Sequence, residues 1–271
     1  MPDDNNLPRY QVYALRYATR EGRRQDNFIG GDPHDGPMPM DYFCWLAISD
    51  ERRFVIDCGF TEEVSAQRKR TYLRNPVDAL ELLGVRAADV EDVIITHLHY
   101  DHAGNLPLFP RALFHLQDAE MTFATGRHMA HPFFSHAYDL EAVLTMVRLT
   151  YGARVRFHTG DAEVLPGVSV HHVGGHTLGL QVVRVWTRLG WMVLASDATH
   201  YLENMNSGRP FPIVADITQM ISGWQRLHQL ASAPQYIIPG HDPLVMQRYP
   251  EAGPTLRGIA VRLDVEPREL P

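Results

Sequence analysis

One short segment constrains the whole chain: residues 94–105, which read Ile-Ile-Thr-His-Leu-His-Tyr-Asp-His-Ala-Gly-Asn. Apolar residues of strand character lead into His97, His99, Asp101 and His102, four ligand-type side chains within six positions. Such a strand is typically buried on both faces, so we expect its ligand-rich end to open at a sheet edge. Imidazole and carboxylate together favour borderline divalent metals such as zinc. A solvated histidine-rich turn is the alternative interpretation.

Three later segments repeat the pattern of a strand that ends in a ligand-type residue. His176 lies in a glycine-flanked turn, Asp197 ends the apolar run 193–197, and His241 follows the run 237–240. Each is weak alone, because a strand-terminal Asp or His is often structural. Together with residues 97–102 they can converge on one edge of a sandwich.

Four ligands in six positions are too many for one tetrahedral site that keeps an open position, so the pattern indicates two adjacent metals. Asp197 would bridge them, which gives each metal four protein ligands. A water-derived hydroxide between the metals would complete both sites, because paired zinc ions lower the pKa of bound water. We assign His97, His99 and His176 to one metal, and Asp101, His102 and His241 to the other.

The remaining pattern predicts one α+β domain over residues 1–271, because no repeat, low-complexity tract or linker interrupts it. Strands, a helix, strands, a helix and a strand fit two βα halves packed sheet to sheet. We expect strands at 9–17, 42–49, 53–57, 92–96, 112–116, 154–157, 168–173, 180–186, 191–195 and 236–238. We expect helices at 76–83, 118–124, 140–149 and 216–230.

Two segments are candidates for shaping a substrate pocket. Residues 28–40 are dense in Gly and Pro and predict a long loop, whose Phe28, Met38 and Met40 would line an apolar pocket or fill core. Residues 117–150 contain a helical insertion that we interpret as a cap. Its Phe133 and Phe134 are further pocket candidates, and the segment would serve equally as an interface between two copies in a homodimer.

Composition limits the partners. A net charge of −7, with no Lys/Arg run, argues against nucleic-acid binding. No apolar stretch reaches the roughly 18 residues of a membrane span, and the polar start of the chain lacks a secretory pattern, so we expect a cytoplasmic protein. We expect Cys44 and Cys58 to be buried thiols, with a disulfide as the alternative.

The ordered set of ligand residues resembles the metallo-β-lactamase-fold hydrolases, from about residue 10 to 245. Within them the chain is most similar to the N-acyl-homoserine lactonase group, through Ser-Asp-Ala at 196–198, Glu203-Asn204, Gly240-His241-Asp242 and the lack of a domain after His241. The resemblance implies an αβ/βα four-layer sandwich, with two mixed β-sheets flanked by helices. It also implies two zinc ions per chain, with Mn, Co or Fe as other divalent metals, and it makes Asp57 a residue that supports a ligand histidine.

The chain departs from this family in one place. The lactonases usually carry a tyrosine three residues after the bridging aspartate, where it hydrogen-bonds the substrate carbonyl. Here that position is His200, and Tyr201 follows it. Either side chain can donate to a carbonyl or a developing oxyanion. A shift of one residue turns a side chain elsewhere, so we favour His200.

We therefore expect a dinuclear zinc hydrolase that opens a lactone, with N-acyl-homoserine lactones among the candidate substrates. A metal-bridging hydroxide would attack the carbonyl carbon, and Asp101 or Asp197 would pass a proton. Another metal-dependent hydrolase of the same fold is the alternative: an arylesterase, amidase, phosphotriesterase or thioester hydrolase. An iron-dependent oxidoreductase of this fold is a more distant one. The expected partner is a small lactone or ester.

Overall fold

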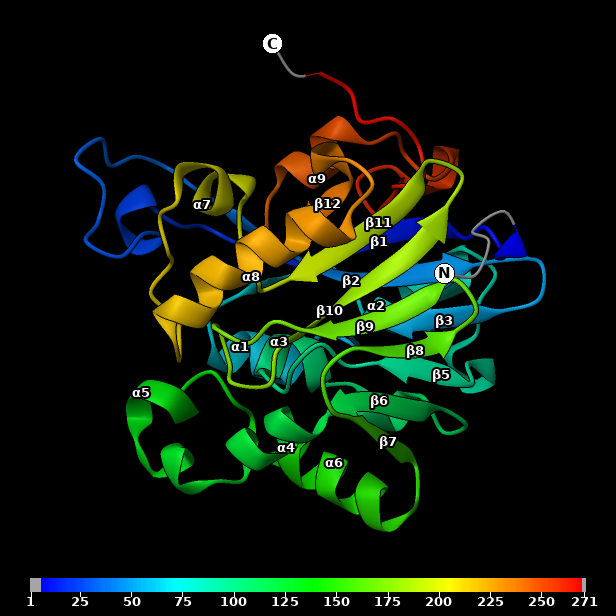
Figure 1. Cartoon of the computed structure of the whole chain (residues 1–271), viewed down its shortest axis with the longest axis horizontal. Helices are drawn as coiled ribbons and strands as arrows, with labels where there is room; N and C mark the ends of the chain where they lie inside the picture. The colour runs from blue at the N-terminus through cyan, green and yellow to red at the C-terminus, as the bar shows by residue number, and fades with distance from the viewer. Residues whose placement is uncertain (1–5, 270–271) are drawn as a thin grey trace.

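Two β-sheets pack against each other in the computed structural model, which describes residues 6–269 (Figure 1). The start of the chain, on which the expected location partly depends, lies outside this range. The first sheet has the order β13 (Ala260–Arg262), β1 (Gln11–Arg20), β2 (Met40–Ile48), β3 (Arg53–Ile56), β5 (Asp92–Ile94), β6 (Leu113–Gln117), β7 (Val155–His158), with β4 (Thr71–Tyr72) on β1. The second has the order β12 (Ile237–Pro239), β11 (Gly190–Ser196), β10 (Gln181–Thr187), β9 (Val168–His172), β8 (Ala162–Leu165).

Both sheets are mixed. In the first, β3, β5, β6 and β7 pair in parallel and β1 pairs antiparallel with its neighbours. In the second, only the β11–β12 pair is parallel among the described strands. The helices are α1 (Glu62–Gln67), α2 (Pro76–Leu82), α3 (Tyr100–Ala103), α4 (Asp118–Ala124), α5 (Pro132–Ser135), α6 (Leu140–Tyr151), α7 (Leu202–Ser207), α8 (Ile217–Leu230) and α9 (Leu244–Arg248).

Three apolar cores hold four layers together. The middle core lies between the sheets, where Trp45 from β2 and Val183 from β10 share one cluster. An outer core joins the first sheet to α2, α4 and α6, and another joins the second sheet to α8 through Trp224 and Leu227. The expected sandwich of two mixed sheets flanked by helices is confirmed.

Each expected strand and helix is present, with ends shifted by a few residues. The expectations missed the short elements β4, β8, β13, α1, α3, α7 and α9. Each has six residues or fewer, and so short an element shows hardly one period of its pattern. Cys44 and Cys58 are buried free thiols, as expected. No helix within residues 6–269 is both long and apolar enough to cross a membrane.

The segment 117–150, which was expected to cap a pocket, packs mainly against the first sheet. Ala142, Val143 and Met146 of α6 belong to the outer core of the first sheet, so α6 is part of the helical layer. Only the chain just after α5, at His136 and Ala137, reaches the main cavity described below.

Candidate metal centre

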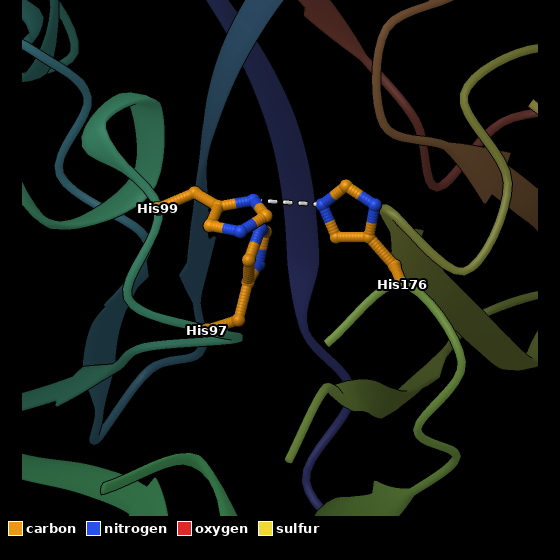
Figure 2. A group of neighbouring side chains, drawn as sticks. All are labelled: His97, His99 and His176. Carbon is orange, nitrogen blue, oxygen red and sulfur yellow. Dashed lines mark hydrogen bonds between the residues drawn. The ribbon is translucent and has the colours of Figure 1, made fainter. Parts of the chain in front are cut away.

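The seven side chains expected as metal ligands converge at one end of the sandwich. All seven are buried, and their ligand atoms form overlapping triplets within 4.8 Å of one another. His97, His99 and His176 form one triplet, and their rings turn toward a common point (Figure 2). Asp101, His102 and His241 form a second triplet, and Asp197 joins a third with His97 and His102.

Asp57 holds the first ligand segment in place. It lies just after β3 and accepts hydrogen bonds from the backbone N and the Oγ1 of Thr96, both at 2.8 Å. Its Oδ2 also lies 2.7 Å from Nδ1 of His102. Asp57 has a φ of 58°, a conformation that a non-glycine residue keeps only when its surroundings enforce it. This position is what the expected role of supporting a ligand histidine requires.

Hydrogen bonds also set which ring nitrogen faces the centre. Nδ1 of His176 lies 2.7 Å from the carbonyl oxygen of Ile213, and Nδ1 of His241 lies 2.9 Å from that of Asp41. Nδ1 therefore carries the proton in both rings, as it does in His102 beside Asp57. Nε2 of each ring therefore faces the centre, where it can bind a metal or, in His102 and His241, a second proton.

These Nε2 atoms fit a cation. The buried Nε2 atoms of His97 and His102 have no hydrogen-bond partner among residues 6–269. Nε2 of His102 lies 3.2 Å from Oδ1 of Asp197. Two such atoms lie this close with a proton or a metal cation between them. Imidazole nitrogens and carboxylate oxygens with a shared focus are the donors that zinc and similar divalent metals prefer.

Asp197 lies between the two triplets. Its Oδ1 is 3.2 Å from Nε2 of His102 and 3.1 Å from Nε2 of His241. Its Oδ2 is 3.2 Å from Nε2 of His176 and 4.0 Å from Nε2 of His97. One carboxylate oxygen thus faces each triplet, which is the arrangement that a bridging ligand needs.

The electrostatics of the cluster also favour bound cations. Burial lowers the pKa of His97, His99 and His176, the last to about 3, so these rings are neutral bases at pH 7. Burial opposes protonation of His102 and His241 too, but the surrounding carboxylates, Asp197 first among them, together outweigh it and raise the pKa of both. One side of the cluster thus presents neutral imidazoles, two of which are hydrogen-bonded to each other, with Nε2 of His176 2.8 Å from Nδ1 of His99 (Figure 2). The other side stabilises positive charge.

His200 and Tyr201 point in different directions. His200 lines the cavity over the centre, its Nε2 is 2.9 Å from Oδ2 of Asp197, and its ring stacks on Phe211 at 3.6 Å between centroids. Burial lowers the pKa of His200 to about 4, so the ring is neutral. The hydroxyl of Tyr201 instead donates toward the carbonyl oxygens of Met38 and Pro39, at 3.4 and 3.1 Å.

The cavity beside the centre has a volume of about 280 Å³. Of the five expected pocket residues, Met40 lines it, and Met38 lies in a separate hollow beside Tyr201. Phe28 is buried in a cluster with Tyr17 and Tyr42, because Arg24 and Arg209 cover its ring from outside. Phe133 is 61% exposed, and its neighbour Phe134 packs against the outer core of the first sheet. Phe133 and Phe134 therefore do not line the cavity, contrary to the expectation, and Phe28 fills core, which was the alternative expected for it.

Sequence reasoning missed four residues beside the centre. Arg20, Arg68 and Arg70 line the cavity, and Glu120 is a buried carboxylate under the ligand loops. The arginines come from two separate segments that no motif links. Glu120 lies in the first turn of α4, where a glutamate ordinarily caps a helix.

Comparisons with known proteins agree with this geometry. Residues 38–241 match the model of the metallo-beta-lactamase superfamily. N-acyl homoserine lactonases of Bacillus sp and Bacillus cereus are both 28% identical over 221 residues, which cover 76% of this chain and 82% of theirs. A quorum-quenching N-acyl homoserine lactone lactonase shares the fold with a TM-score of 0.73 at 23% identity, over 88% of this chain and 93% of that one.

A further solved structure, a dizinc quorum-quenching lactonase in complex with a product, has a TM-score of 0.68 at 16% identity, over 88% of this chain and 89% of that one. Because both solved structures are less than 25% identical to this chain, the similarity to them shows a shared fold only. Together with the match over residues 38–241, it shows that the chain belongs to the metallo-β-lactamase superfamily.

Proposed function

We propose that this metal-dependent hydrolase opens a small lactone and uses two divalent metal ions, zinc being the expected pair. The observation that carries the proposal is the position of Asp197 between two buried triplets, one of three histidines and one of Asp101, His102 and His241. The similarity to N-acyl homoserine lactonases supports a cyclic ester as the substrate.

The chain's own groups have distinct parts in the proposed reaction. When bound, the two metals supply an activated water and a Lewis acid for the carbonyl. Asp101 lines the cavity, so it is placed to take a proton from the water and return it to the leaving alkoxide. The neutral ring of His200 has one N–H, which donates from Nε2 to Oδ2 of Asp197. Once Asp197 is committed to the metals, this N–H would be released to donate to the carbonyl oxygen as charge develops on it.

The experiment that tests this function combines metal analysis with a substrate panel. Mass spectrometry of the zinc-loaded protein should give two zinc ions per chain, and chelation should remove both the metal and the activity. Among lactones, aryl esters, amides, thioesters and phosphotriesters, at least one lactone should have the highest kcat/KM. A phosphotriester or thioester far ahead of every lactone would replace the proposed function, and an activity that depends on iron and consumes oxygen would exclude it.

Replacing His200 by phenylalanine should lower kcat about 100-fold or more, as the loss of one oxyanion donor does in other enzymes. The zinc content should stay at the level of the unsubstituted protein, because each metal keeps its proposed ligands. Tyr201→Phe is the matched control: its hydroxyl is bonded to Met38 and Pro39, so kcat should change little. Loss of zinc from His200→Phe would instead make His200 a ligand and contradict its role as a donor.

A further inference from the structure

Three arginines line the same cavity as the candidate metal centre. Arg20 is the last residue of β1, and Arg68 and Arg70 lie between α1 and β4. All three are partly buried, so a large part of each side chain is shielded from bulk water. The sequence segments are remote from one another, and the fold brings them to one wall.

None of these guanidinium groups has a carboxylate within 4.0 Å among residues 6–269. Arg24 and Arg209, which lie outside the cavity, are by contrast both paired with Asp32. Nε of Arg20 is buried without any hydrogen-bond partner in the described chain. A buried and unpaired charged donor is costly, and a ligand that accepts its hydrogen bonds removes this cost.

The other two arginines are held in position in advance of a ligand. The guanidinium of Arg68 lies 3.9 Å from the ring centre of Tyr100 and donates to the carbonyl oxygens of His136 and Tyr138, at 2.8 and 3.0 Å. Arg70 donates from Nε to the hydroxyl of Tyr100 at 3.1 Å and from Nη1 to the carbonyl of Arg68 at 2.8 Å. These bonds leave Nη2 of Arg70 available to donate to a ligand. Because the side chains are already held in place, ligand binding requires little further loss of side-chain freedom.

The charge of the whole cavity points the same way. Its lining contains two carboxylates, Asp101 and Asp197, and the proposed function commits both to the metals. Two divalent cations carry more positive charge than these two groups neutralise, so the three arginine charges remain uncompensated. A cavity with a positive potential attracts anions and raises their local concentration, whereas a neutral molecule is not attracted in this way. The fork of a guanidinium matches the oxygens of a carboxylate or phosphate.

We propose, on the basis of the proposed function, that the substrate is a compact lactone carrying an oxyanion group, which Arg20 and Arg70 bind while Arg68 fixes the wall behind them. The volume of about 280 Å³ favours a small molecule, since ligand pockets usually enclose roughly 300–1,000 Å³. An N-acyl-homoserine lactone is uncharged and lacks such a group. The substrate therefore differs in charge from that of the relatives.

The test uses matched pairs of γ-lactones that bear a carboxylate or the corresponding primary amide, attached to the ring directly or through one to three methylene groups. For the zinc-loaded protein, kcat/KM should favour the carboxylate at least about 10-fold in one pair. Arg20→Gln and, separately, Arg70→Gln should bring this ratio close to one. Arg111→Gln, which removes an exposed charge outside the cavity, should leave the ratio unchanged. Thermal unfolding confirms that each variant is folded.

A binding measurement separates the two proposals. Isothermal titration of the zinc-loaded protein with glutarate and with inorganic phosphate should give binding that weakens at least about 10-fold in Arg20→Gln. The tighter of the two ligands identifies a carboxylate or a phosphate as the recognised group. Lactone hydrolysis with equal rates for acid and amide, or anion binding that does not depend on Arg20, overturns the anionic substrate and leaves the proposed function standing. Arginine-dependent binding without hydrolysis of any lactone overturns the proposed function alone.

Discussion

Replacing Asp197 by asparagine should lower kcat/KM at least about 1,000-fold, which corresponds to about 4 kcal/mol of transition-state stabilisation. Asp197 directs one oxygen toward His102 and His241 and the other toward His176. An amide has one neutral oxygen in place of two charged ones, so it cannot serve both triplets. The variant should retain fewer than two metals per chain, which mass spectrometry of the loaded protein measures.

Asp264→Asn is the matched control for this substitution. Asp264 is also a buried carboxylate, but it accepts a hydrogen bond from the backbone N of Val12 and pairs with Arg262, far from the cavity lining. Its substitution should affect stability alone and leave metal content and kcat/KM in place. If Asp197→Asn instead kept two metals and near-normal turnover, Asp197 would not be the bridging residue.

The convergence of the seven expected ligands could be predicted from the sequence because of a general property of sheets. His97, Asp197 and His241 each follow a strand, and chain segments that leave strands at the same end of a sandwich come together. The short spacing of residues 97–102 adds a pattern that few structures other than a metal site require. Strand ends and the spacing of residues 97–102 were together sufficient to predict the position of the centre.

The direction of a side chain within a turn is a different matter. His200 and Tyr201 are neighbours, and what separates them is a pair of backbone carbonyls at residues 38 and 39 that bind the tyrosine hydroxyl. Phe133 and Phe134 show the same limit, because aromatic residues in a short helix do not reveal which surface they meet. Arg20 and Arg70 lie in the same wall of the cavity because segments remote in the sequence come into contact. A single sequence does not predict which remote segments do so.

Glu120 is the residue whose importance is most hidden in the sequence. Its Oε1 accepts hydrogen bonds from the backbone N of Leu98 at 2.9 Å and the hydroxyl of Tyr138 at 3.0 Å. Its Oε2 accepts one from Oγ1 of Thr177 at 2.6 Å. Leu98 lies between two ligand histidines and Thr177 follows a third. Glu120 therefore ties both ligand loops, one from each half of the sandwich, to the start of α4.

Replacing Glu120 by alanine should lower the free energy of unfolding by about 3–5 kcal/mol, because three buried donors lose their acceptor and a cavity opens. Chemical denaturation of metal-free protein measures this change. Glu120→Gln keeps the shape and one acceptor oxygen, so it should lose much less stability. Glu141→Ala, on the exposed surface of α6, is the control and should be nearly neutral.

The same substitution tests whether the centre is assembled before it binds metal. If Glu120 holds the two loops in register, Glu120→Ala should also weaken zinc affinity about 10- to 100-fold, as the loss of other outer supports of metal sites does. Competition with a chelator at a temperature where the variant is fully folded separates this effect from unfolding. Unchanged affinity in the folded variant would mean that the metals themselves bring the loops together and that Glu120 contributes only to stability.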